Sequence, residues 1–373
     1  MRPNLLMLSG DNALAQGKRG AFANTLSVFS QHWGRVDVLC PQVAQPATLQ
    51  PFDNVWLHPA PVGKAGYVRW LYQYGQALHR QHAYQILVSH DYGLFLNGWG
   101  GRLLSRSLQL PQISEIHHVE GYPRAANLRE RLQAWLTWGY VRAQTARVAA
   151  FRVPNRTELP PLLQRWGVPA AKILLLYSLY LDLETFCPQP ASVRTYHALW
   201  VGRLVANKAP ALFLQALAKV CQTLPDLQAV LLGSGPLAAQ LRASAQQLGL
   251  TRHLTWLDWL PDTAALATLY RQANALVCTS YSEGGPRVVA EALACGTPVI
   301  TSAVGLSGEL ITPGQNGFIC DWQPDDFAAR ICQVAEPAAQ AQLAAYAPQA
   351  VQGFAKQDVL ARYAAGLQTF ARP

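Results

Sequence analysis

The chain has 373 residues, half of them hydrophobic and only 14% charged, so it has room for two ordinary domains with substantial cores and is not intrinsically disordered. Its longest apolar runs, such as 173–176, fall far short of the roughly 18 residues that span a bilayer, which excludes a transmembrane helix. Most of the net charge of +9 lies in residues 1–150, where 14 Lys and Arg against 7 Asp and Glu give +7. This asymmetry indicates an anionic partner (a membrane surface, a phosphorylated acceptor or a nucleic acid), and a solvated basic face is the alternative.

The first apolar run, 5–8, is too short for the core of a signal peptide and suits a first β-strand. The seven cysteines are odd in number and scattered, and no pair has the spacing of metal ligands. That usage is typical of small buried side chains in a reducing compartment. We therefore expect a cytoplasmic protein.

Short apolar runs alternate with amphipathic stretches along the first half of the chain. The expected strands are 5–9, 35–40, 54–58, 85–90, 112–116, 148–152 and 172–176. The expected helices are 21–32, 68–82, 94–107 and 128–143. Strands that alternate with helices imply a parallel sheet covered on both faces.

A second series of the same kind fills the rest of the chain. Its expected strands are 197–201, 228–232, 253–256, 275–278, 298–301 and 317–320. Its expected helices are 209–223, 236–248, 263–272, 286–294 and 324–334. Two such series predict two doubly wound α/β domains.

The segment 187–192, Cys-Pro-Gln-Pro-Ala-Ser, has the composition of a turn and lies between the two series, so we place the linker there. The expected domains are 1–187 and 188–340. The tail 341–373 is rich in Ala and Gln with helical spacing, and we expect it to pack back towards the first domain.

The densest signal follows the expected strand 275–278, at the edge of a parallel sheet where ligands bind. Gly284 and Gly285 permit a tight turn and a close approach of the backbone to a ligand. Pro286 suits the first position of a helix, and Gly296 suits the left-handed residue that ends it. The amides and the positive dipole end of that helix would face whatever occupies the loop.

Two carboxylates accompany this helix. Glu283 precedes the turn, and Glu291 lies more than one helical turn further on, four residues after Arg287. In these different settings they could bind hydroxyls of two different parts of one ligand. An ion pair between Arg287 and Glu291 on an ordinary capped helix is the alternative.

The Glu-x7-Glu spacing, with the flanking patterns Glu-Gly-x-Pro and Glu-Ala-x-Ala-x-Gly-x-Pro-Val-Ile, resembles the retaining glycosyltransferases of family 4. The resemblance implies the GT-B fold, in which two doubly wound Rossmann-like domains face an interdomain cleft. It implies an N-terminal domain that binds the acceptor and a C-terminal domain that binds the nucleotide-sugar. Glu291 would then bind the ribose and Glu283 a sugar hydroxyl, with Gly284, Gly285, Pro286 and Arg287 around the donor.

A second match is 201–208, which resembles the family segment in which an Arg and a Lys bind the donor diphosphate. The corresponding residues here are Arg203 and Lys208. A transferase without a metal needs fixed cations to stabilise the leaving diphosphate. The sequence offers no Asp-x-Asp pair in a plausible metal-binding loop, so we expect neither a metal nor another cofactor.

Three further matches are shorter. The segment 231–236 resembles a strand followed by Gly-x-Gly-Pro, so Gly233 and Gly235 are expected near the nucleotide. Asp258 stands where the family has a glycine, which alters the surroundings of the base. Gly17 and Gly20 take the place of the glycine-rich loop after the first strand and could face the diphosphate or an anionic acceptor.

After the strand 112–116, His117 and His118 stand in the place of a histidine that lies near the donor sugar in the family. Adjacent side chains of an extended chain point to opposite sides, so only one of them faces the cleft. We choose His118. The other is expected to be a hydrogen-bonded structural histidine.

The stretch 128–142 combines arginines and aromatic residues at helical spacing. This composition suits a helix that lies at a membrane interface, and it suits equally well a helix that is buried on one side.

Together these features predict a retaining, metal-independent glycosyltransferase that moves a hexose from a UDP- or GDP-sugar to a glycan or lipid-linked acceptor. A role in the synthesis of a cell-surface polysaccharide or glycoconjugate follows, at the inner face of the membrane. No nucleic-acid partner is expected, because the sequence carries no recognition motif of that kind. The alternatives are a non-catalytic nucleotide-sugar-binding GT-B subunit and a GT-B epimerase.

Overall fold

The computed structural model describes residues 2–18, 20–189 and 193–372. Arg19 of the glycine-containing loop and 190–192 of the expected linker therefore lie outside the described residues. The chain forms two compact units. The first comprises Met1–His117, Trp135–Ser178 and Gln357–Pro373, and the second comprises His118–Ala134 and Leu179–Lys356.

Unit 1 contains an eight-stranded sheet in which all neighbouring strands are parallel except the edge pair β3 and β4. Its strands, in spatial order, are β3 (Leu49–Phe52), β4 (Val55–Pro59), β2 (Arg35–Cys40), β1 (Asn4–Leu8), β5 (Ile86–His90), β6 (Gln112–Glu115), β7 (Ala150–Val153) and β8 (Ile173–Leu175). The central strands are buried almost without interruption, as expected for a parallel sheet covered on both faces.

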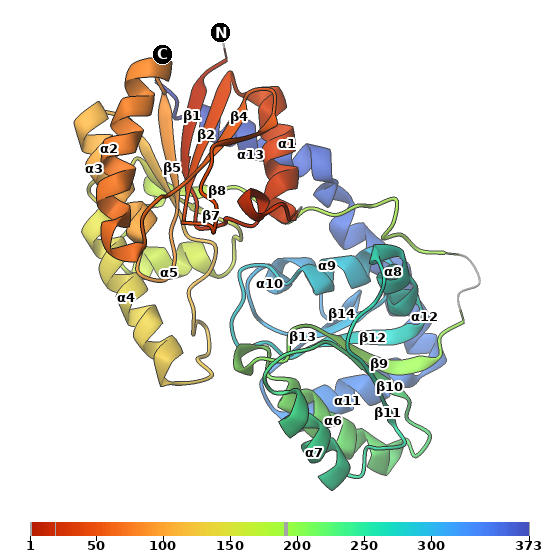
Figure 1. The fold of residues 1–373 in the computed structure, drawn as a ribbon. Coiled ribbons are helices and arrows are strands. Elements are labelled where there is room, and N and C mark those ends of the chain that lie inside the picture. The colour runs from red at the N-terminus through yellow and green to blue at the C-terminus, as the bar shows by residue number, and fades with distance from the viewer. Residues whose placement is uncertain (1, 19, 190–192, 373) are drawn as a thin grey trace. The chain divides into compact units, whose positions relative to one another are not determined.

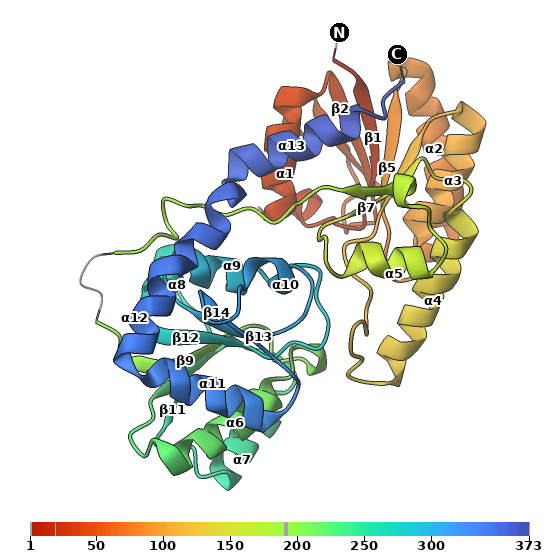
Figure 2. The same ribbon diagram turned by 180° about the vertical axis from the view of Figure 1, so that it is seen from behind.

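Helices cover both faces of this sheet. They are α1 (Ala21–His32), α2 (Lys64–His82), α3 (Leu96–Leu108), α4 (Leu128–Gln144), α5 (Leu159–Arg165) and α13 (Lys356–Gln368), with short 3-10 turns η1 (Leu14–Gln16) and η2 (Ala170–Lys172). Helices α2 and α3 pack side by side on one face, and α1 and α13 lie on the other (Figures 1 and 2). The helix α4 begins within the segment that belongs to unit 2.

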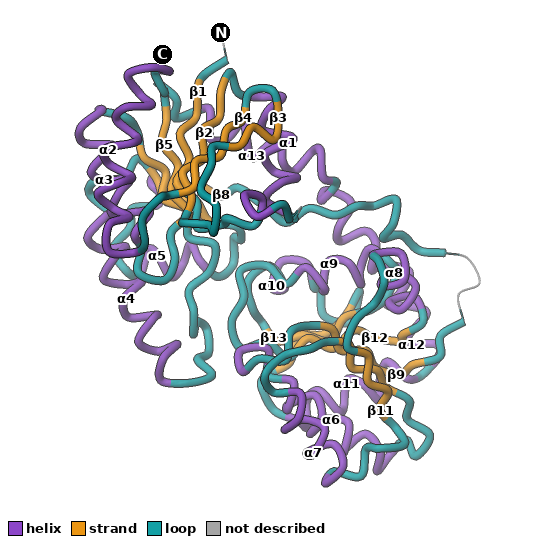
Figure 3. The backbone as a smooth tube through the Cα atoms, viewed as in Figure 1, coloured by secondary structure: helices purple, strands orange, loops and turns teal. Residues whose placement is uncertain are grey.

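Unit 2 contains a six-stranded parallel sheet with helices on both faces (Figures 1 and 3). Its strands, in spatial order, are β11 (Leu254–Leu257), β10 (Ala229–Leu232), β9 (Tyr196–Val201), β12 (Ala273–Cys278), β13 (Val299–Ser302) and β14 (Gly317–Cys320). Its helices are α6 (Pro210–Thr223), α7 (Ala238–Gln247), α8 (Thr263–Arg271), α9 (Arg287–Ala294), α10 (Ser307–Leu310), α11 (Pro324–Ala335) and α12 (Pro337–Tyr346), with η3 (Ala206–Lys208) and η4 (Ala347–Phe354). The predicted doubly wound α/β architecture is thus confirmed.

The expected strands all form, within two residues of the predicted bounds, but one strand and two short helices were missed, among them the four-residue α10. The first is β3, which is short, mostly exposed and antiparallel at the sheet edge, and which contains Pro51. Such an edge strand lacks a continuous apolar run and gives no clear pattern. The second is the seven-residue α5, in which Pro160 and Pro161 occupy the first turn.

The C-terminal helix α13 packs within unit 1. The ring of Tyr363 meets that of Phe29 on α1 edge-on at 5.2 Å. The Tyr363 hydroxyl donates a hydrogen bond to the buried carboxylate of Glu115 at the end of β6. No helix among the described residues is both long and apolar enough to cross a bilayer.

A buried carboxylate lies under the helical layer of α3 and α4. Oδ2 of Asp91 accepts hydrogen bonds from Ser89 Oγ at 2.9 Å and from Tyr140 OH at 2.6 Å, and also from Ser114 Oγ. Its other oxygen is buried and has no hydrogen-bond partner among the described residues. Burial raises the pKa of Asp91 to about 7, and the three hydrogen bonds oppose this shift only in part.

We predict that Asp91 makes the protein less stable as the pH rises. The folded state retains a proton on Asp91 that the unfolded state has already lost, so stability falls between the unfolded pKa of 3.8 and the folded value of about 7. The Asp91→Asn variant lacks this proton equilibrium. Between pH 5 and pH 8 the wild type should therefore lose free energy of unfolding relative to Asp91→Asn, on the order of a few kcal/mol. The melting temperature of the wild type should fall relative to that of the variant over this range.

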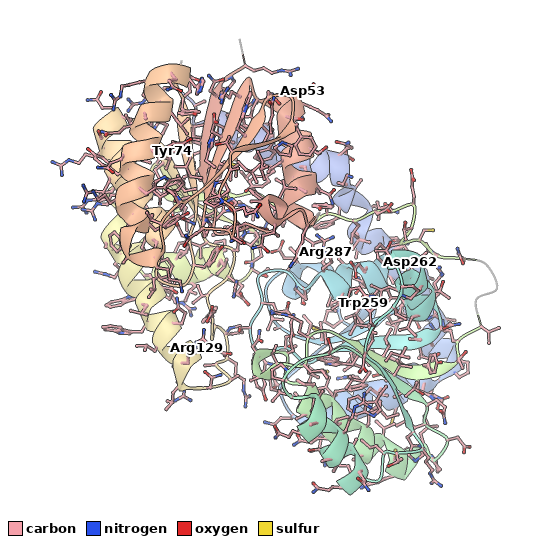
Figure 4. The ribbon with its side chains drawn as sticks, viewed as in Figure 1. Asp53, Tyr74, Arg129, Trp259, Asp262 and Arg287 are labelled. Carbon is pink, nitrogen blue, oxygen red and sulfur yellow. The ribbon has the colours of Figure 1, made fainter. Side chains whose placement is uncertain are left out.

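The control is Asp53→Asn, which removes the same charge from an exposed position of unit 1 (Figure 4). The melting temperatures of this variant and of the wild type should change in parallel with pH. A constant difference between Asp91→Asn and the wild type across the pH range would show that Asp91 is ionised throughout.

Candidate functional site

The candidate site is built around an ion pair in unit 2. Lys208 ends the short turn after β9, and Glu283 lies in the loop after β12. Lys208 Nζ lies 2.6 Å from Glu283 Oε1, and both side chains are mostly buried. The hydroxyl of Ser280 donates a second hydrogen bond to the same carboxylate oxygen at 2.5 Å. Because β9 and β12 are neighbours in a parallel sheet, their carboxyl ends bring these groups together.

Hydrogen bonds between the two loops fix this pair. The hydroxyl of Thr279 donates to the carbonyl oxygens of Lys208 at 2.9 Å and Ala209 at 3.0 Å. The same hydroxyl accepts a bond from the indole nitrogen of Trp200 at 3.0 Å. The amide of Tyr281 donates to the carbonyl oxygen of Asn207 at 2.7 Å. The loops after β9 and β12 are thus joined as one unit.

A cavity of about 410 Å³ opens at the carboxyl ends of β9, β10 and β11. Its lining includes the predicted residues Arg203 and Gly233 and the adjoining Gly202. A side chain at Gly233 would come within 1.8 Å of the carbonyl oxygen of Gly202. At Gly235, a Cβ atom would come within 2.6 Å of the carbonyl oxygen of Leu204. Glycine at both positions therefore lets the loops after β9 and β10 lie in direct contact.

The other wall of this cavity consists of residues that the sequence analysis did not assign to the site. They are contributed by the loop after β11 and the start of α8, and comprise Trp259, Leu260, Asp262, Thr263 and Leu266. Trp259 is 83% exposed, and Asp262 caps α8 by accepting a hydrogen bond from the amide of Ala265 at 2.8 Å (Figure 4). A tryptophan in the turn after a strand, next to Asp258, is a local signal that could have marked this wall.

Asp258, which replaces the family glycine, also lines the cavity. Its side chain is exposed and lies 3.1 Å from Arg242, whose guanidinium group stacks on Trp256 at 4.7 Å. The substitution therefore adds a carboxylate to the cavity rim.

The second carboxylate of the motif, Glu291, is buried inside α9. Its Oε2 accepts a hydrogen bond from Tyr270 OH at 3.0 Å. Burial raises the pKa of Glu291, against the opposing effects of Arg287 and Tyr270. The guanidinium group of Arg287 donates to the carbonyl oxygen of Tyr180 at 2.9 Å and stacks on that ring at 4.9 Å. Arg287 therefore acts on Glu291 through its charge, while its hydrogen bond goes elsewhere.

The turn that leads into α9 is tightly packed. Pro286 occupies the N-cap with an extended ψ of 103°, so the helix begins at Arg287, one residue later than predicted. A Cβ on Gly305 would come within 2.5 Å of the carbonyl oxygens of Glu283 and Gly284. A Cβ on Gly285 would make only ordinary contacts of 3.5 Å or more. The predicted left-handed residue Gly296 has a φ of 75°.

The two adjacent histidines belong to different units. His118 is exposed in unit 2, and its pKa is lowered because the surrounding protein restricts its solvation. Glu120 and Glu283 oppose this shift, whereas Lys208 supports it. His117 belongs to unit 1, where its Nδ1 lies 3.2 Å from the guanidinium group of Arg152.

The two predicted glycines of the first half lie in unit 1. Gly17 ends the turn η1 with a φ of 78°, and Gly20 is the N-cap of α1. A Cβ on either glycine would meet no atom within 4 Å. Of these two, only Gly17 has a backbone conformation that favours glycine.

Among the described residues, one group could hold a metal ion. It consists of His90, Glu115 and His117, whose ligand atoms lie within 4.8 Å of one another. Arg152 Nη1 lies 3.7 Å from Glu115 Oε2 and 3.2 Å from His117 Nδ1. Because arginine is always protonated, it donates a hydrogen bond to Nδ1 of His117, and the other ring nitrogen of His117 carries a hydrogen. This arrangement neutralises Glu115 with arginine and suits an ion-pair network better than a metal ion.

Curated proteins similar to the chain are glycosyltransferases by name. A D-inositol 3-phosphate glycosyltransferase from Mycobacterium sp. (strain JLS) is 30% identical over 289 residues, which are 73% of this chain and 63% of the relative. The protein of the same name from Segniliparus rotundus is 27% identical over 69% of this chain and 59% of the relative. The chain thus spans about three fifths of the length of these relatives.

Solved structures match over nearly the whole chain. A sucrose-phosphate synthase from Thermosynechococcus elongatus has a TM-score of 0.75 at 20% identity and covers 99% of each chain. Anabaena HepE in complex with UDP-glucose has a TM-score of 0.73 at 19% identity, over 98% of this chain and 100% of that one. These matches confirm the predicted GT-B fold. Residues 188–350, which include the Lys208–Glu283 pair, match the family described as Glycosyl transferases group 1.

Proposed function

We propose that the protein is a glycosyltransferase that transfers a hexose from a nucleotide-diphosphate sugar with retention of configuration and without a metal ion. The observation that carries the proposal is the Lys208–Glu283 pair, whose lysine lies on the same loop as Gly202 and Arg203 of the 410 Å³ cavity in unit 2. The match of 188–350 to group 1 glycosyl transferases and the names of the similar proteins support it.

The donor would lie along the carboxyl ends of β9, β10 and β12. The base would occupy the cavity between Gly233 and Trp259, since a nucleobase needs an apolar wall and a close backbone approach. Arg203, at the edge of this cavity, and Lys208, at the end of the same loop, would bind the diphosphate. Two fixed cations on one loop can stabilise the negative charge that develops on the leaving group.

The two motif carboxylates would bind different parts of the donor. Glu291 is desolvated, and a buried carboxylate is stabilised by each hydrogen-bond donor it gains. Ribose hydroxyls would supply such donors. Glu283 would bind a sugar hydroxyl while Lys208 turns to the diphosphate, with the amides of Gly284 and Gly285 nearby. The acceptor hydroxyl would attack from the face of the departing phosphate and give its proton to that phosphate.

The acceptor is proposed to be a glycan or a lipid-linked molecule used in cell-surface polysaccharide or glycoconjugate synthesis. The exposed face of α4 supports a membrane-proximal acceptor, because Leu128, Leu132 and Trp135 are 78%, 58% and 64% exposed. The names of the curated relatives indicate a phosphorylated polyol instead, which would be free in solution. A membrane-binding test separates these two acceptors.

Two other functions share the fold. A non-catalytic nucleotide-sugar-binding subunit would bind the donor without turning it over, and an epimerase would change the sugar without an acceptor. The Lys208 ammonium group held at Glu283 supports transfer over mere binding, because a binding protein needs no stabilisation of a leaving group.

We predict that Glu291 contributes mainly to the binding of the nucleotide and Glu283 mainly to turnover. Glu291→Gln should weaken the binding of UDP or GDP by roughly ten- to a hundred-fold, because it removes a charged hydrogen-bond acceptor. Glu283→Gln should mainly lower kcat for hydrolysis of the nucleotide-sugar. Calorimetry and a donor hydrolysis assay check both, with Glu336→Gln, an exposed residue of unit 2, as the control. Wild-type kinetics in both variants would contradict the assignment.

We also predict that activity survives an excess of chelator. Arg203→Ala and Lys208→Ala should each reduce turnover strongly, by on the order of a hundred-fold or more, because the leaving diphosphate loses a fixed cation. Lys219→Ala is the matched control, since this lysine of unit 2 is exposed and pairs with Asp325 on the surface. An enzyme that chelator silences and Mn²⁺ restores would refute metal independence.

Peripheral membrane binding is predicted for the exposed face of α4. Its apolar residues Leu132 and Trp135 would enter the interface while Arg129, Arg131 and Arg142 contact anionic headgroups, each contributing about 1 kcal/mol. The protein should co-sediment with anionic vesicles at low salt, dissociate at high salt, and ignore neutral vesicles. Arg129 lies near the start of the helix (Figure 4).

Replacement of these three arginines by glutamine should weaken the binding without affecting donor hydrolysis. The control variant replaces three exposed arginines of α2 and α3: Arg69, Arg80 and Arg106. It carries the same total charge, so equal loss in both variants would indicate a diffuse electrostatic effect. Failure to bind anionic vesicles at low salt would favour a phosphorylated acceptor in solution.

A further inference from the structure

A loop from the first half of the chain is incorporated in unit 2. The chain leaves unit 1 after His117, and the segment His118–Ala134 belongs to unit 2 before the chain returns at Trp135. The first part of this segment, 118–127, precedes α4 and is called here the docked loop. No hydrophobic or glycine pattern in the sequence marks this assignment.

Arg124 attaches the docked loop to unit 2. Its guanidinium carbon lies 4.9 Å from the ring centre of Tyr281 and 5.5 Å from that of Trp322. Its backbone amide donates a hydrogen bond to the carbonyl oxygen of Tyr281 at 3.2 Å. The two rings themselves pack edge-on at 6.3 Å. A planar cation against two aromatic rings is a favourable contact that lysine reproduces only in part.

The contacts of Arg124 continue to the candidate site. The indole nitrogen of Trp322 donates to the carbonyl oxygen of Ser280 at 2.9 Å, and the hydroxyl of Ser280 holds Glu283. The amide of Tyr281 is bonded to the carbonyl oxygen of Asn207, next to Lys208. Both rings beneath Arg124 are therefore tied directly to the loops that carry the Lys208–Glu283 pair.

The rest of the docked loop contacts the start of α4, at Glu130. The amide of Ala126 donates to Glu130 Oε2 at 2.7 Å, and the amide of Glu130 donates to Asn127 Oδ1 at 3.0 Å. Gly121 has a φ of 78°, and a Cβ there would come within 2.8 Å of the carbonyl oxygen of Glu130. The loop is thus a compact piece, and Arg124 is its point of contact with Tyr281 and Trp322.

We propose that Arg124 is a positioning residue, which docks the loop 118–127 on the loop that carries Glu283 and thereby fixes His118, the first residue of the docked loop, in unit 2. The charges of Glu283 and Lys208 act on His118 there. The inference rests on the proposed transferase function for its catalytic consequence. The docking itself does not depend on that function.

The test compares the wild type with Arg124→Gln and Arg124→Lys in three measurements. Hydrogen exchange of the amides 119–127 reports docking, calorimetry reports affinity for UDP and GDP, and hydrolysis of UDP-glucose and GDP-mannose reports turnover. Arg124→Gln should speed exchange in the loop and lower kcat roughly ten-fold, since displaced groups lose reactive geometry, while diphosphate affinity stays within about two-fold. Arg124→Lys should restore part of both losses.

Tyr281→Leu supplies an independent partner variant. It should reproduce part of the effect of Arg124→Gln, because the contact of Arg124 with Trp322 remains, and the double variant should lose no more than Arg124→Gln alone, because the contact with Tyr281 is already lost there. Arg106→Gln, an exposed arginine of unit 1, controls for the loss of charge.

Unchanged exchange of 119–127 in Arg124→Gln would overturn the docking role. Faster exchange with wild-type turnover would overturn the positioning role. A wild type that binds neither UDP nor GDP would instead overturn the proposed function, and the exchange measurement would still decide whether Arg124 docks the loop.

Discussion

The ion pair between Lys208 and Glu283 is the contact on which the arrangement of the candidate site depends. Its members lie on the loops after β9 and β12, 75 residues apart in the chain, and their parallel strands end at the same edge of the sheet. A pair that is mostly removed from water is stable only where its geometry is fixed and its remaining polar atoms are bonded. Ser280 and Thr279 meet this requirement, one by holding the carboxylate and the other by joining the two loops.

The sheet order of unit 2 explains why this pair and the cavity lie close together. Strand β9 lies between β10 and β12, so the single loop that follows it reaches both neighbours. Through Lys208 it contacts the loop after β12, which carries Glu283. Through Gly202 and Arg203 it lines the cavity together with Gly233. Glycine is required at position 233 because the loops after β9 and β10 touch through their backbones. A larger residue at position 233 would push the loop after β10 away from the loop after β9.

Much of this architecture could be predicted because buried parallel strands appear in a sequence as short continuous apolar runs. The helix of the Glu-x7-Glu segment could also be predicted, since Pro286 precedes it and Gly296 follows it. The edge strand β3 could not, because it is exposed and contains Pro51. The membership of 118–127 in unit 2 also escaped prediction. Arg124 of this loop stacks on two rings more than 150 residues further along the chain, and no local pattern encodes such a contact.

The two carboxylates of the motif differ in a way that follows from their backbone positions. Glu283 lies in a loop, where Lys208 and Ser280 reach it from two directions and satisfy one of its oxygens. Glu291 lies inside a helix that is buried from Val289 to Ala294, and there its pKa is raised and Tyr270 donates a hydrogen bond to one oxygen. A loop carboxylate that is held by side-chain partners can exchange one of them for a ligand during a reaction. A helical carboxylate in a desolvated position cannot move far, and it favours a ligand that brings its own hydroxyl donors. The fixed spacing therefore separates a loop carboxylate that can change its partners from a helical carboxylate that cannot. The proposed function needs this division, because one part of the donor would be held while another part reacts.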